Sequence, residues 1–163
     1  MQCPLMFRLR TVDRLPEPGS LATHKGTVVH GVLERLYDLP ASERLPQAAL
    51  ELLPGQWASH RDKDPGVMDL FEDADHVETW LEEARRLIRT YFTLENPQRL
   101  EPAERELFVQ TETGDGLLLR GFVDRLDVAP DGAMRVVDYK TGRSPGTRFM
   151  EEALFQMRFY ALV

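Results

Sequence analysis

The amino-acid sequence predicts an α/β domain in which helices flank three antiparallel strands. Apolar residues recur at helical spacing in three segments, near residues 25–39, 73–92 and 147–163. Between the second and third segments, alternating apolar residues and a Pro-Asp-Gly turn indicate strands. The predicted order is therefore a helix, a helical insert, three antiparallel strands and a final helix.

Composition fits one ordinary globular domain with a single core: the chain has 163 residues, of which 42% are hydrophobic and 29% charged. The net charge of −7 argues against a generally basic nucleic-acid-binding protein but leaves room for a local basic groove. No apolar run approaches membrane-spanning length and no signal-peptide pattern begins the chain, so we expect a cytoplasmic location without a membrane partner. The single Cys3 cannot form an internal disulfide, which agrees with a reducing compartment.

A helix is predicted from about Lys25 to Leu39 and is expected to pack on the sheet. Its apolar stripe consists of Val28, Val29, Val32, Leu33 and Leu36. His30 lies at the edge of that stripe, where a histidine is more often a satisfied boundary residue than a ligand. Glu34 lies farther round the helix and by default faces solvent. Gly26, one turn before His30, would let another backbone approach closely.

A helical insert is expected over residues 41–99, between the first helix and the sheet. Its first part, from Ala41 to Asp75, is predicted to contain helical pieces and loops, because it carries Pro46, Pro54, Gly55, Pro65 and Gly66. Residues 73–92 predict a long core helix whose acidic start and arginine-rich end match the helix dipole. A strand is then predicted over Glu104–Glu112.

The most informative stretch is a hairpin within residues 121–142, where two apolar segments flank residues 130–132. The Pro-Asp-Gly sequence fits a three-residue loop with Gly in the left-handed conformation. Across such a loop the numbers of paired residues sum to 262, so Asp124 is predicted to lie opposite Asp138.

Three charged groups are expected on one face of this hairpin. Since side chains alternate along a strand, Lys140 points the same way as Asp138, and Tyr139 points the other way. Facing carboxylates raise each other's pKa, and a divalent cation between them is the simplest resolution. Oxygen ligands favour magnesium or manganese over zinc. A solvated face on which Lys140 bridges two acids explains the same pattern equally well.

Four short motifs follow one another along the chain. They are G-x-x-x-H at Gly26 to His30, G-F-V-D ending at Asp124, D-Y-K at Asp138 to Lys140, and Q-x-x-x-Y at Gln156 to Tyr160. Each motif alone is weak. In this order and spacing, over almost the whole chain, they resemble the RecB-type nuclease domains of the PD-(D/E)xK superfamily.

The resemblance implies a restriction-endonuclease-like α/β core with a mixed sheet, forming a single nuclease domain over residues 1–163. It implies a metal-dependent DNA exonuclease of repair or recombination that hydrolyses phosphodiester bonds, with Mg²⁺ or Mn²⁺ as cofactor and DNA as partner, and it leaves open a helicase partner or domain. One alternative is a non-catalytic DNA-binding or scaffold module of a helicase–nuclease complex. A purely structural fragment is a third alternative.

The resemblance also implies metal ligands. Matched by motif, His30, Asp124 and Asp138 would bind the ion, and the backbone carbonyl of Tyr139 would be a further ligand. Glu34 fits the same helix and is a secondary candidate.

The remaining matched residues would act on the substrate. Together with Asp124 and Asp138, Lys140 would form the catalytic set, holding the attacking water and stabilising charge that develops on the phosphate. Gln156 and Tyr160 would contact the DNA strand beside the scissile bond.

Two departures from the superfamily pattern are normal in its RecB-like branch: Val123 replaces a proline, and Asp138 replaces a glutamate. In the iron–sulfur subset, a cysteine at the place of Cys3 is joined by three more beyond the Q-x-x-x-Y helix. A 4Fe-4S cluster is therefore expected only if a longer chain supplies those three cysteines. The helical spacing of apolar residues continues to Val163 without a capping signal, so we expect a domain truncated at its C-terminus.

Overall fold

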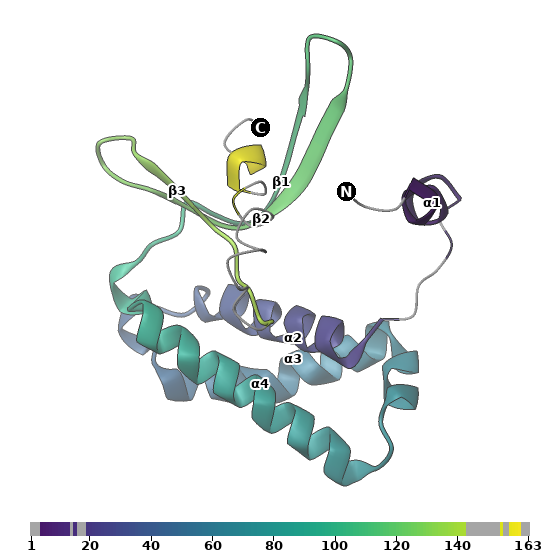
Figure 1. Ribbon diagram of the computed structural model, residues 1–163. Helices are drawn as coiled ribbons and strands as arrows, with labels where there is room; N and C mark the ends of the chain where they lie inside the picture. The colour runs from purple at the N-terminus through teal and green to yellow at the C-terminus, as the bar shows by residue number, and fades with distance from the viewer. Residues whose placement is uncertain (1–3, 14, 16–18, 143–153, 155–156, 161–163) are drawn as a thin grey trace.

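The computed structural model describes residues 4–13, 15, 19–142, 154 and 157–160. Within them, three long helices form a layer beneath a small sheet (Figure 1). The long helices are α2 (Leu21–Leu36), α3 (Pro46–Lys63) and α4 (Ala74–Leu94). Shorter helical segments are α1 (Pro4–Phe7), η1 (Arg8–Val12), η2 (Ala41–Glu43), η3 (Pro65–Leu70) and η4 (Pro97–Arg99). No helix in the described ranges combines the length and the apolar character that a bilayer crossing requires.

Side-chain caps set where the two best-predicted helices begin. Helix α2 starts one turn earlier than predicted, because the Ser20 hydroxyl accepts a hydrogen bond from the Thr23 backbone N–H at 3.2 Å. Helix α4 starts directly after Asp73, whose carboxylate accepts from the His76 N–H at 2.8 Å. Both helices are therefore confirmed with small shifts at their ends.

Helix α3 continues through a proline that was expected to mark a loop. The predicted helical pieces are present, but Pro54 does not separate two of them. An interior proline costs about 3 kcal/mol. Pro54 itself is exposed, whereas Leu53 and Trp57 of the same helix are buried, and each such side chain contributes about 1.5–3 kcal/mol. Packing therefore outweighs the local penalty.

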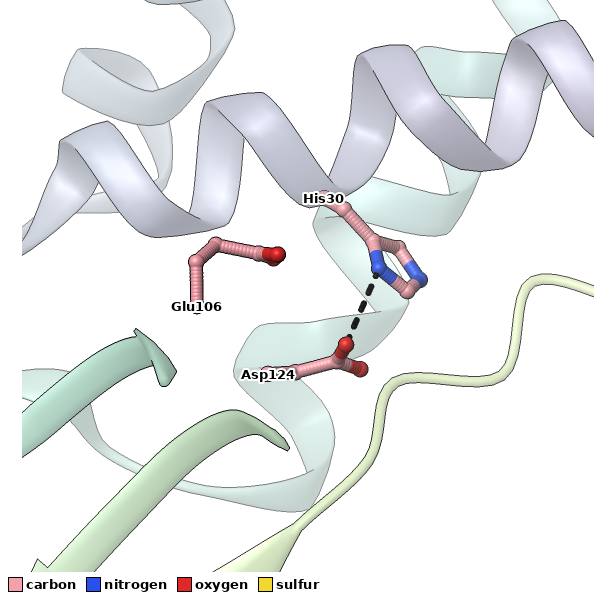
Figure 2. A group of neighbouring side chains, drawn as sticks. All are labelled: His30, Glu106 and Asp124. Carbon is pink, nitrogen blue, oxygen red and sulfur yellow. Dashed lines mark ion pairs between the residues drawn. The ribbon is translucent and has the colours of Figure 1, made fainter. Parts of the chain in front are cut away.

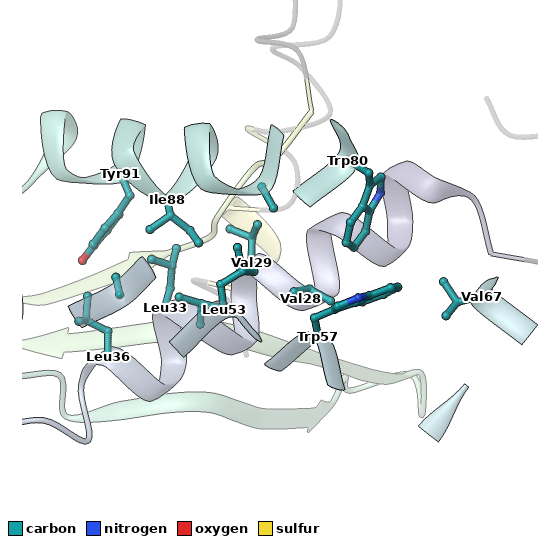
Figure 3. Close-up of a cluster of buried hydrophobic side chains, with 13 residues drawn as sticks. Val28, Val29, Leu33, Leu36, Leu53, Trp57, Val67, Trp80, Ile88 and Tyr91 are labelled. Atoms are coloured by element: carbon teal, nitrogen blue, oxygen red, sulfur yellow. The ribbon is translucent and has the colours of Figure 1, made fainter. Parts of the chain in front are cut away.

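The hydrophobic core lies between the three long helices (Figure 3). Its buried members are Val28, Val29, Val32, Leu33, Leu36, Ala49, Leu53, Trp57, Val67, Trp80, Ala84, Ile88 and Tyr91. The expectation that the stripe of α2 packs on the sheet is therefore wrong in its main part, because that stripe packs among α3 and α4. Within this core, Trp57 of α3 contacts Trp80 of α4, with ring centroids 4.8 Å apart.

Three antiparallel strands form the described sheet in the order β1 (Glu104–Glu112), β2 (Leu118–Val128) and β3 (Met134–Val137), which confirms the predicted meander. The β2–β3 pairs include Arg125 with Val137, and their numbers sum to 262 as predicted. Gly132 adopts φ +86° in the three-residue loop. Strand β3 ends at Val137, so residues 138–140 follow it in irregular backbone.

A buried arginine joins the sheet to the helical layer. The guanidinium of Arg125, which is 0% exposed, forms a bidentate ion pair with Glu95 after α4, at 2.8 Å for both contacts, and contacts Asp127 at 3.0 and 3.2 Å. It also lies 2.7, 3.3 and 2.8 Å from the phenol oxygens of Tyr37, Tyr91 and Tyr139. Burial opposes the charge, but the Glu95 carboxylate outweighs it and raises the pKa of Arg125. The charge therefore persists inside the protein.

Replacing Arg125 should destabilise the fold strongly. Arg125→Met leaves Glu95 without its buried cation, and breaking such a pair costs about 3–5 kcal/mol. Arg135→Met is the matched control, because Arg135 contacts the same two carboxylates but is half exposed, where an ion pair contributes about 0–1 kcal/mol. Urea denaturation followed by circular dichroism measures both free energies of unfolding. Equal losses in the two variants would contradict the assigned role of Arg125.

Candidate metal centre

His30 projects from the middle of α2 toward the strands (Figure 2). Its Nε2 lies 2.8 Å from the Tyr139 carbonyl oxygen, and its Nδ1 lies 3.5 Å from a carboxylate oxygen of Asp124. Gly26 stands one turn earlier, where an added Cβ would lie 3.0 Å from the Thr141 hydroxyl. The missing side chain at Gly26 thus lets the segment after β3 approach α2, as the sequence suggested.

Asp124 lies on β2 and reaches across to the same segment. Its second carboxylate oxygen accepts a hydrogen bond from the Tyr139 backbone N–H at 2.6 Å. The backbone of Tyr139 therefore holds both His30 and Asp124, one through its carbonyl and the other through its N–H. The Tyr139 carbonyl therefore lies beside His30, and its role as a metal ligand stays a prediction.

Glu106 of β1 completes the group and was not predicted from the sequence. The neighbouring β1–β2 pairs are Arg105 with Arg125 and Leu107 with Val123, so the register sets Glu106 opposite Asp124. Its φ of +46° lies in the left-handed region, which is uncommon for a residue with a side chain and is often found at functional sites. Glu106 stands between Arg105 and Leu107 and belongs to none of the four motifs. The signal that could have found it is the three-residue loop at 114–116, which sets the β1–β2 register.

The ligand atoms of His30, Glu106 and Asp124 all lie within 4.8 Å of one another. Although Glu106 is exposed, its partial desolvation and the neighbouring carboxylates of Asp124 and Glu34 raise its pKa. Burial opposes the charged form of His30, but the Asp124 carboxylate and the Tyr139 carbonyl outweigh it and raise the pKa of that imidazole. One imidazole and two carboxylates thus face a common point, where a cation would relieve the repulsion between the acids.

Asp138 and Lys140 form an ion pair beside this group. The Lys140 ammonium lies 2.5 Å from the Asp138 carboxylate, and the Lys140 side chain is 57% exposed. In the described part of the chain, the cluster of ligand atoms does not include Asp138. The Tyr139 side chain points to Arg125 instead, so these three residues alternate as predicted although they lie beyond the strand.

Glu34, the secondary candidate, lines a cavity of about 420 Å³ between α2 and α3 together with His30 and Glu106. The Tyr160 hydroxyl donates to the backbone carbonyl of Phe122 at 2.6 Å, two residues before Asp124. Of the helix predicted over residues 147–163, the described residues Leu154 and 157–160 are helical. Gln156 and Cys3 lie outside the described residues.

Comparisons with known proteins agree with the motifs. The PD-(D/E)XK nuclease superfamily matches residues 1–163. Gene 69 protein of Mycobacterium phage D29 is 27% identical over 183 residues, covering 99% of this chain and 64% of that protein. A subunit of the ATP-dependent helicase/deoxyribonuclease of Streptococcus pyogenes is 26% identical over 121 residues, covering 71% of this chain and 10% of that protein.

The chain thus spans about two thirds of the phage protein and a tenth of the streptococcal protein. The match to the superfamily, in contrast, runs the full length of the chain. It includes α2, which carries His30, and the strands that carry Glu106 and Asp124. The resemblance inferred from the four motifs is confirmed, and the chain belongs to the PD-(D/E)XK nuclease superfamily.

Proposed function

We propose that this chain is a metal-dependent deoxyribonuclease that hydrolyses phosphodiester bonds as an exonuclease, in DNA repair or recombination. The observation that carries the proposal is the convergence of His30, Glu106 and Asp124 within 4.8 Å. Membership of a nuclease superfamily supports nuclease chemistry. Similarity to part of a protein named as a helicase/deoxyribonuclease supports DNA as the substrate and a helicase as a partner.

The donor set fits a divalent cation. Two carboxylates supply hard oxygen ligands, the Tyr139 carbonyl lies 2.8 Å from the His30 ring, and the imidazole adds one nitrogen. Carboxylate and carbonyl oxygens suit Mg²⁺ and Mn²⁺, and both ions retain water molecules that a phosphate oxygen can replace. We assign His30, Asp124, Glu106 and the Tyr139 carbonyl as ligands and keep Asp138 as a further candidate.

The neighbouring side chains supply the other requirements of phosphodiester hydrolysis. Lys140 is more than half exposed, so its ammonium can leave Asp138 and stabilise charge on the phosphate. That movement would free the Asp138 carboxylate for the cation. When bound, the metal ion would lower the pKa of a coordinated water and polarise the phosphate. Tyr160 and Gln156 would contact the strand beside the scissile bond.

Removing one ligand should weaken metal binding. We expect Glu106→Gln, His30→Ala and Asp124→Asn each to raise the dissociation constant for Mn²⁺ by on the order of 10- to 100-fold or more, since even outer partners of metal ligands have effects of that size. Glu104→Gln is the control, because Glu104 is an exposed carboxylate on the same strand. Isothermal titration calorimetry measures the constants. If Glu106→Gln and Glu104→Gln bind Mn²⁺ equally well, Glu106 is not a ligand.

Removing the Lys140 ammonium should reduce catalysis. By analogy with loss of one oxyanion donor, Lys140→Ala should lower kcat by on the order of 100- to 1,000-fold. Arg99→Ala removes an equal charge from η4 and should retain activity. Release of nucleotides from linear single-stranded and double-stranded DNA with Mg²⁺ or Mn²⁺ measures the rate. Cleavage of covalently closed circles would contradict an exonuclease, and unchanged activity in Lys140→Ala would contradict the role of Lys140.

Metal affinity should increase with pH. Metal binding requires a neutral imidazole, and the pKa of His30 is raised in the metal-free protein. The His30–Asp124 pair therefore stabilises the metal-free fold fully below pH about 6.5 and loses this contribution as the pH rises through the higher pKa of the folded state. Nuclear magnetic resonance of the His30 ring should show that it loses its proton at a pH above the ordinary histidine pKa of about 6.5. Mn²⁺ should bind more tightly above the pKa measured for His30. An affinity independent of pH would contradict His30 as a ligand.

A further inference from the structure

The cavity of about 420 Å³ extends from the candidate metal centre along the groove between α2 and α3. At one end it is lined by His30 and Glu106, and along its length by a polar face of the helical insert. That face consists of Gln56, Ser59, His60 and Lys63 on α3. These positions are spaced by three or four residues, so they share one side of the helix. We call this face the α3 wall.

Two residues of the α3 wall are positioned by contacts within α3 and with α2. His60 stacks on Trp57 at 6.2 Å between ring centroids, and one of its nitrogens lies 2.9 Å from His24. Gln56 lies over α2 at Gly31, where an added Cβ would be only 2.8 Å from its amide oxygen. The fold thus positions hydrogen-bonding groups along a groove that starts at the metal ligands.

Charge is segregated along this groove. The acids Glu34 and Glu106 lie at the metal end, and Lys63 lies at the far end, in the last turn of α3. Arg35, which also lines the cavity, is paired with Asp38 at 3.1 Å. Lys63 is exposed and has no carboxylate within salt-bridge distance among the residues the structure describes. A cation at the far end of a groove that starts at the candidate metal centre is suited to a polyanion that runs along the groove from one to the other.

We propose that the α3 wall binds a single DNA strand that leaves the metal centre, with a backbone phosphate on Lys63. The proposal rests on the proposed function, because it extends the same site. From Gln56 to Lys63 the wall rises about 10 Å at 1.5 Å per residue. A strand within duplex DNA carries one phosphate per about 3.4 Å of helix axis, and a single strand is more extended, so the wall spans at most about three nucleotides. The cavity has the volume of a small-molecule site, which suits one strand better than a duplex.

The binding of a fluorescent single-stranded oligonucleotide, measured by anisotropy with divalent metal chelated, tests this proposal without requiring catalysis. Lys63→Ala should weaken binding by on the order of tenfold, as expected for loss of one charged hydrogen bond. It should also reduce the slope of log K against log salt by about 0.7, the value for one phosphate on a single strand. Arg61→Ala is the matched control, since Arg61 lies on the same turn but over the Trp57 ring, outside the cavity.

Equal binding by Lys63→Ala and Arg61→Ala, or no binding by the wild-type chain, would overturn the proposal. A duplex of the same sequence should bind more weakly, and equal affinity would overturn its single-strand part. Thermal melts of both variants exclude unfolding as the cause of a loss. A wild-type chain that binds the strand through Lys63 but cuts no DNA with metal would refute the proposed nuclease activity. The same result would support strand binding by the α3 wall.

Discussion

The structure depends on the buried guanidinium of Arg125. The hydrophobic core lies among the helices, and Val123 is the buried apolar side chain that the sheet supplies in the described ranges. Polar contacts of Arg125 therefore connect the two layers, through Glu95 after α4 and through the Tyr139 hydroxyl. The Tyr139 backbone in turn holds His30 and Asp124. One buried cation thus links the stability of the fold to the geometry of the candidate metal centre.

Much of this arrangement could be predicted because it follows from local rules. Helical spacing identifies α2 and α4, although the Ser20 cap starts α2 one turn before the predicted residue. The Pro-Asp-Gly loop fixes the β2–β3 register, which brings Asp124 toward the segment that follows Val137. The alternation of side chains then separates Tyr139 from the charged residues on either side of it. Each of these inferences requires only neighbours in sequence or a single tight turn.

Glu106 escaped prediction although a local signal for it exists. It joins the site through the β1–β2 register, and that hairpin has a three-residue Gly-Asp-Gly loop at 114–116, closed between Thr113 and Leu117 in the same way as the Pro-Asp-Gly loop. The same turn argument that paired Asp124 with the segment after Val137 would have set Glu106 opposite Asp124. Other features depend on tertiary packing: helix α3 crosses Pro54 because its buried face packs against its neighbours. The insert could be predicted to be helical, but its polar wall becomes visible only when α2 lies beside it.

The proposed function requires that one divalent ion binds His30, Asp124 and Glu106 at the junction of α2 and the sheet. A crystal of the protein grown with Mn²⁺, with anomalous diffraction collected near the manganese absorption edge, tests it most directly. One anomalous peak is expected, bonded to all three side chains at about 2.0–2.2 Å from their ligand atoms. A peak bound by Asp124 and Asp138 without Glu106, or no peak at this junction, would contradict it.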